Sequence, residues 1–120
     1  MRAISQITIS VLFVWLAIIS CSDNPLAFKS DEIDVLVSKN KMTIINKTEN
    51  PIFYFVVERE TAAAINWVPI SSSENEIIPQ QNKQLNLNDV FGFKAGRQII
   101  VYYWSDPNPQ SIKNIVVNTK

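Results

Sequence analysis

The sequence predicts an all-β fold, an antiparallel two-sheet sandwich of about seven strands, and three features of the chain indicate it. Short runs of apolar, β-branched and aromatic residues recur between turn formers at spacings near about 8–12 residues. Two of these runs, residues 52–57 and 98–104, are apolar on both strand faces and predict central strands. No segment has the length and period of a helix that would be stable alone, so packed sheets are the expected layers.

The first 20 residues have the layout of a secretory signal. Arg2 precedes an apolar run, residues 11–19, and the small residue Ser20 follows it. A signal peptide needs a positive start, an apolar stretch of roughly 7–15 residues and small residues at its cleavage point. The run is short for a helix that spans a bilayer, which takes about 20 apolar residues. Residues 1–20 are therefore predicted to be a cleaved signal.

The only cysteine of the chain, Cys21, follows this run directly. The junction resembles the lipobox of bacterial lipoproteins in Ile18-Ile19-Ser20-Cys21, with Ile18 in place of the commoner leucine and Ile19 in place of a smaller residue. The resemblance implies cleavage before Cys21, a diacylglyceryl group on its sulfur, and a membrane bound through that lipid. Ser22 stands where an aspartate favours the inner membrane in many bacteria, which implies a cell envelope protein of the outer membrane. An ordinary cleaved signal and an uncleaved anchor are the alternatives.

The mature chain is predicted to be one domain on a short tether. The 120 residues less the 20 of the signal leave 100, which suits a single core. Residues 21–31 are expected to form the tether, because Pro25 and its polar neighbours discourage regular structure. Residues 32–120 then form the sandwich. One cysteine cannot form an internal disulfide, so the core must hold the fold together without one.

The first half of the domain predicts a hairpin followed by a central strand. Residues 33–37 and 42–45 have the alternation of half-buried strands, and the four residues between them read as a turn. Turn formers at 46–51 lead into the central strand at 52–57. Residues 58–60 are charged and are expected to carry the chain out to solvent.

The middle of the chain predicts less regular structure. Residues 61–64 have the makings of one helical turn with Thr61 as its N-cap, but four residues do not sustain a helix, so a crossing segment is expected. Residues 65–70 alternate weakly and are assigned to an edge strand, because Pro69 lacks the N–H of a ladder bond. A loop over residues 71–76 and a short extended piece over 77–79 follow.

Three more elements complete the chain. Residues 84–88 alternate cleanly and predict a strand with Leu85 and Leu87 facing inward. Both glycines of the chain lie within residues 90–96, which indicates a bent loop rather than a phosphate-binding loop. The central strand at 98–104 and a last strand at 112–117, joined by turn formers, form a terminal hairpin.

This order of elements resembles that of the immunoglobulin-like superfamily. The central segments 52–57 and 98–104 take the places of its two central core strands. The Cys–Trp–Cys signature of immunoglobulin domains is absent, so the resemblance is one of pattern.

Composition excludes several classes of function. The chain balances 11 Lys and Arg against 11 Asp and Glu, so it lacks the basic surface that nucleic acids require. It has no histidine, which removes the commonest general base and zinc ligand. Glu58 and Glu60 on one face of a strand end are the remaining pair of carboxylates, and such a pair makes a glycosidase only within a cleft. No catalytic residue, metal or cofactor is therefore predicted.

Aromatic residues are the remaining candidates for binding, and we single out Trp67, Tyr103 and Trp104. For any one of these rings a place in the core is the favoured interpretation, and an exposed binding row is the alternative. Tyr103 and Trp104 are adjacent in a strand and must face opposite sides of the sheet, so one of them faces outward. The expected function is a non-catalytic binding or accessory module for another envelope protein. The alternative is a carbohydrate-binding module, for which exposed rings should be flanked by polar side chains.

Overall fold

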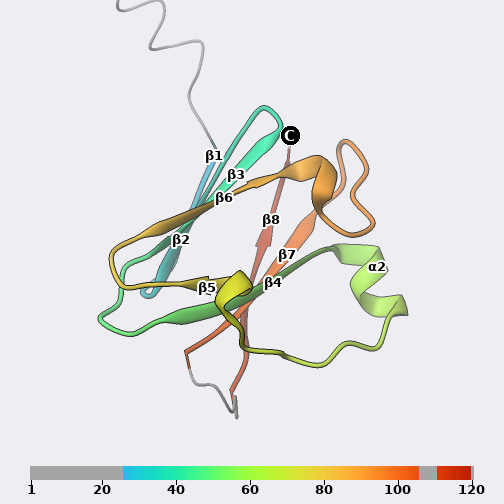
Figure 1. The fold of residues 1–120 in the computed structure, drawn as a ribbon. Helices are drawn as coiled ribbons and strands as arrows, with labels where there is room; N and C mark the ends of the chain where they lie inside the picture. The colour runs from blue at the N-terminus through green and yellow to red at the C-terminus, as the bar shows by residue number, and fades with distance from the viewer. Residues whose placement is uncertain (1–25, 106–110, 120) are drawn as a thin grey trace, which may run out of the picture.

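The structure, a computed structural model, describes residues 26–105 and 111–119 (Figure 1). The predicted signal, Cys21 and residues 106–110 of the predicted turn lie outside the described residues. Eight antiparallel strands form two four-stranded sheets, which confirms the two-sheet β-sandwich. It has one strand more than the seven or so expected.

The first sheet has the strand order β1-β2-β3-β6. Its strands are β1 (Leu26–Lys29), β2 (Ile33–Ser38), β3 (Lys41–Asn46) and β6 (Asn82–Asn86). The predicted hairpin is confirmed, because β2 and β3 pair across a two-residue turn in which Lys39 has a φ of 55°. The alternating residues of β2 and β3 place one apolar row inward and a mixed row outward.

The second sheet has the strand order β5-β4-β7-β8. Its strands are β5 (Glu76–Ile77), β4 (Ile52–Glu58), β7 (Ile99–Trp104) and β8 (Lys113–Val117). The two segments that are apolar on both faces are its central neighbours, paired from Phe53 with Trp104 to Glu58 with Ile99. With the edge strands β1 and β5 left aside, the strand orders β2-β3-β6 and β4-β7-β8 match the orders A-B-E and C-F-G of immunoglobulin-like sandwiches.

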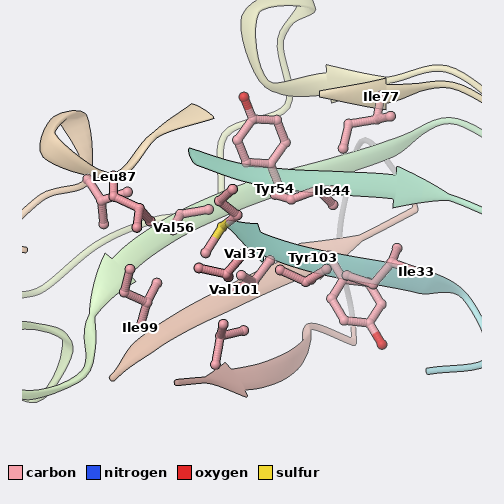
Figure 2. Close-up of a cluster of buried hydrophobic side chains, with 14 of the residues drawn as sticks. Ile33, Val37, Ile44, Tyr54, Val56, Ile77, Leu87, Ile99, Val101 and Tyr103 are labelled. Atoms are coloured by element: carbon pink, nitrogen blue, oxygen red, sulfur yellow. The ribbon is translucent and has the colours of Figure 1, made fainter. Parts of the chain in front are cut away.

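The core lies between the sheets and is built from alternate residues of the central strands (Figure 2). Apolar side chains that leave water supply most of the stabilisation of such a sandwich. Its fully buried members include Ile33, Val35, Met42, Ile44, Ile52, Ile77, Leu87, Ile99, Val101 and Val117. Leu87 and the partly buried Leu85 both pack on the core as predicted, but Leu87 does so from the 3-10 helix η2 (Leu87–Asp89), just beyond β6.

The prediction of a tether through residue 31 is wrong from Leu26 onward. Residues 26–29 form β1, which pairs with β2 from Leu26 opposite Val37 to Lys29 opposite Asp34. Phe28 packs against the core. The backbone of the open edge of β2 can be satisfied by any extended segment, so the strand forms despite a weak local pattern.

The middle of the chain differs most from expectation. Residues 59–64 form a helix, α2 (Arg59–Ala64), where a crossing segment was expected, and its N-cap is Glu58 rather than Thr61. Residues 65–70 form no strand. After them come the 3-10 helix η1 (Ser73–Asn75) and the two-residue β5. Pro69 lacks the N–H of a ladder bond, and the segment instead crosses the outside of the second sheet, where Trp67 contacts Phe55 and Tyr102.

Candidate interaction site

The outer face of the second sheet carries a cluster of aromatic rings beneath residues 65–72, which we call the strap. Phe55 of β4 and Tyr102 of β7 are paired across the sheet. The Trp67 ring of the strap lies with its centroid 4.7 Å from the centroids of both. It also lies 6.2 Å from the centroid of Trp104. Such tilted aromatic pairs add stabilisation beyond the area they bury, so Trp67 fixes the strap to the sheet.

The three aromatic residues singled out from the sequence do not form an exposed row. Tyr103 and Trp104 face opposite sides of the sheet, as their adjacency requires, and Tyr103 points into the core (Figure 2). Trp104 points outward but is only 3% exposed, because the strap covers it and Ser71 Oγ accepts its indole N–H at 2.9 Å. Trp67 is half-buried. Trp67 and Trp104 therefore lie in the same aromatic cluster on the outer face of the sheet. Tyr103, 5% exposed, is a core residue.

A groove of about 370 Å³ opens between the strap and the edge of β4. It is lined by Tyr54, Phe55, Val56, Trp67, Val68, Ile70, Asn75, Leu85 and Trp104. The strap residues Val68 and Ile70 are 74% and 68% exposed, which is unusual for two large apolar side chains so close in sequence. The groove thus joins a buried aromatic floor to an exposed aliphatic rim.

The Asn75 side chain and the Trp104 indole N–H, which line the groove, are already used within the domain. The Asn75 amide nitrogen donates to Tyr54 O at 3.0 Å and to Ile70 O at 2.7 Å. Its carbonyl oxygen accepts from Ser72 N at 2.9 Å and from Ser72 Oγ at 3.1 Å. Burial raises the pKa of the Tyr54 hydroxyl above its ordinary value of 10.0, so Tyr54 stays neutral. What the groove offers a ligand is therefore mainly apolar surface.

Of the three aromatic residues predicted from the sequence, Trp67 and Trp104 belong to this site and Tyr103 does not, and the strap was not predicted. The assignment of residues 65–70 to an edge strand put Val68 and Ile70 on a sheet, where alternation would have turned them to the same face. Pro69 and the polar run Ser71-Ser72-Ser73 fit an irregular crossing segment better than the edge strand that was predicted.

A second site with unusual chemistry is the buried carboxylate of Glu58, at the junction of β4 and α2. The residue is 1% exposed, which contradicts the expectation that residues 58–60 lead out to solvent. Its carboxylate accepts from Glu60 N at 2.6 Å, Thr61 N at 3.0 Å and Thr61 Oγ1 at 2.7 Å. Arg97 Nη1 lies 3.7 Å from Glu58 and 2.6 Å from Glu60. A single arginine thus faces both carboxylates and offsets part of their negative charge.

The balance of these contacts favours the ionised form of Glu58. Burial raises the pKa of the carboxyl, but the hydrogen bonds from Glu60 and Thr61 and the charge of Arg97 together hold it below the ordinary value of 4.5. A group in this state is a helix cap rather than a proton donor or acceptor near neutral pH.

Replacing Glu58 with glutamine is expected to lower the free energy of unfolding at pH 7, with a deficit that shrinks in acid. Because the folded pKa is depressed, the ionised carboxylate stabilises the fold above the ordinary pKa of 4.5, and this contribution is lost as the pH falls through the folded pKa. Urea unfolding from pH 7 to pH 3 measures it. Glu60→Gln is the control, because Glu60 is exposed and makes a surface ion pair. A Glu58→Gln deficit that is the same at every pH would contradict the assignment.

Two further properties of the described residues bear on function. Among residues 26–105 and 111–119, no three side chains of His, Cys, Asp or Glu gather where they could hold a metal ion. The same residues include no helix that is long and apolar enough to cross a membrane.

No family model, no curated protein and no solved structure matches the chain.

Proposed function

We propose that the chain is a lipid-anchored protein of the bacterial cell envelope whose sandwich is a non-catalytic binding module for another envelope protein. The lipobox resemblance at Ile18-Ile19-Ser20-Cys21 supports the anchor. The apolar groove beside the strap is the observation that carries the binding role. On the argument from Ser22, the outer membrane is the expected location.

The chemistry of the groove favours a protein over a sugar as its ligand. A sugar-binding site presents an open ring with polar groups beside it that can bond the hydroxyls of the sugar. Here the Asn75 amide and the Trp104 indole N–H are committed to partners within the domain. The exposed rim is aliphatic, from Val68 and Ile70. Apolar side chains of a partner protein match such a surface, and buried aromatic residues beneath it are typical of the centre of an interface.

In-cell photo-crosslinking from the rim tests the binding role. A photoreactive residue in place of Val68 is expected to crosslink one envelope protein, and a second substitution, Ile70→Asp, to reduce that product at least about tenfold by placing a charge in an apolar contact. A photoreactive residue in place of Ile78 is the control, because Ile78 is also exposed but does not line the groove. Absence of the product, with binding to a glycan array that Ile70→Asp abolishes, would favour the carbohydrate-binding alternative.

The anchor has its own test in the N-terminal residue of the mature protein. Mass spectrometry of the N-terminal fragment is expected to show acyl chains on Cys21, since several chains on one residue hold a protein firmly to a bilayer. Cys21→Ala is expected to lose that mass and to release the protein from the membrane fraction. An unmodified Cys21 in a released protein would favour the ordinary cleaved signal. An alanine variant that stays in the membrane would favour the uncleaved anchor.

A further inference from the structure

The two ends of the sandwich differ in charge. One end, which we call the tether end, holds the start of β1, the β2–β3 turn, α2 and the loop at 87–97, and the opposite end is the far end (Figure 1). Leu26 pairs with Val37 beside the turn, and Leu87 N donates to Asn40 O at 2.8 Å. A cleft of about 470 Å³ at this end is lined by Lys39, Lys94 and Thr119 among others. These contacts place all of these segments at one end.

Cations exceed carboxylates at the tether end, and carboxylates exceed cations at the far end. The described residues of the tether end are Lys39, Lys41, Lys94, Arg59 and Arg97 against Glu58, Glu60 and Asp89. Those of the far end and its adjoining strand positions are Lys29, Lys47, Lys83 and Lys113 against Asp31, Glu32, Asp34, Glu49, Glu74 and Glu76. Arg97 lies against Glu58 and Glu60, and the side chains of Lys39, Lys41 and Lys94 are exposed at the surface of this end. The lysines therefore set the sign of the potential at that end.

The start of β1 also lies close to Cys21 along the chain. Five residue steps separate Cys21 from Leu26, and a fully extended chain covers at most about 18 Å in that distance. The far end lies further away by the length of a seven-residue strand, which is about 23 Å. The early start of the domain at Leu26, rather than at residue 32, is what brings the tether end so near.

We propose that the tether end faces the bilayer and that Lys39, Lys41 and Lys94 contact anionic phospholipid headgroups. This inference rests on the proposed lipidation of Cys21. A lysine near an anionic membrane surface increases binding roughly fivefold, and salt screens the effect. The acidic far end would be repelled by the same surface. In this orientation the groove, whose floor runs from Phe55 in the middle of β4 to Trp104 toward the far end, stays open to proteins.

Fluorescence quenching on vesicles tests the orientation. The acylated full-length mature protein is reconstituted into vesicles of phosphatidylethanolamine and phosphatidylglycerol that carry a headgroup quencher. A fluorophore is attached to Asn88→Cys at the tether end or to Glu49→Cys at the far end, both exposed positions. Because the two labels would differ in height by about one strand length, we expect at least about twofold stronger quenching of the label at position 88.

Charge and salt decide whether the lysines produce that orientation. The triple variant Lys39→Gln, Lys41→Gln, Lys94→Gln is expected to reduce the difference in quenching between the two labels. Vesicles of phosphatidylcholine should have the same effect, and so should 0.5 M salt, where the Debye length is about 4 Å. Equal quenching of the two labels, or a difference that none of these changes reduces, would overturn the proposal. A protein that fails to join vesicles at all, with no acyl mass on Cys21, would instead overturn the proposed anchor.

Discussion

Replacing Gly92 with alanine is expected to lower the free energy of unfolding by about 2–5 kcal/mol, from left-handed backbone strain and a steric overlap together. Gly92 has a φ of 76°, and an added Cβ would lie 2.1 Å from Thr61 Oγ1 and 2.8 Å from Thr61 Cβ. The Thr61 hydroxyl donates to the Glu58 carboxylate, so it cannot turn away without breaking that hydrogen bond. The loop therefore has to move away from α2.

The other glycine of the loop provides a matched control. Gly96 has a φ of 84°, but an added Cβ there would meet nothing within 4 Å. Gly96→Ala is expected to cost only the backbone strain, about 1–2 kcal/mol. Urea unfolding of both variants, of Thr61→Ala and of the double variant Gly92→Ala with Thr61→Ala separates the contributions. Because Thr61→Ala removes the overlap, the double variant should lose less unfolding free energy than the two single variants together. Equal losses at the two glycines would show that α2 does not lie against Gly92.

Replacing Asn46 with alanine is expected to lower the free energy of unfolding by about 2–4 kcal/mol, because it leaves buried polar partners unpaired. Asn46 is 0% exposed and lies at the end of β3. Its amide nitrogen donates to Asn50 O at 2.8 Å and to Ile77 O at 2.9 Å. Its side-chain oxygen accepts from Thr48 N at 2.9 Å and from Thr48 Oγ1 at 2.7 Å. One side chain thus joins the first sheet to β5 of the second.

An exposed asparagine of similar local role is the control for this prediction. Asn86 accepts from Asn88 N at 2.9 Å as the N-cap of η2 but is exposed, so Asn86→Ala is expected to cost about 1 kcal/mol. Asn46→Asp should be at least as damaging as Asn46→Ala, since a carboxylate would face the carbonyl oxygens of Asn50 and Ile77. Denaturant unfolding measures all three. Equal losses for Asn46→Ala and Asn86→Ala would contradict the bridging role.

The strands that the sequence predicted correctly are those whose signal is local. Residues 33–37, 42–45, 52–57 and 98–104 carry the alternation or the density of apolar residues that a strand needs, whatever surrounds them. The pairing of strands then follows from the positions of the turns. The two segments that are apolar on both faces must lie in the middle of a sheet, where other parts of the chain bury both faces. This is why the sandwich could be predicted without its contacts.

What could not be predicted depends on partners distant in sequence. β1 forms because β2 has an open edge with which it can pair. Its four residues, of which only Phe28 is half-buried, carry no local pattern that predicts a strand. Glu58 is buried because α2 and Arg97 supply partners for its charge, although a glutamate at a strand end usually reaches solvent. The strap is placed by the contacts of Trp67 and Ser71 with aromatic residues of the sheet. In each case tertiary contacts overrode a weak local preference.

The direction of β1 determines how the domain would bear a mechanical load. β1 begins at the tether end and runs antiparallel to β2. A pull on the chain before Leu26, directed away from the tether end, acts along the strand axis, so it loads all the hydrogen bonds of the β1–β2 ladder in shear at once. If β1 began at the far end, the same pull would open the ladder one bond at a time. The sandwich is thus connected to the preceding chain in the geometry that resists rupture better.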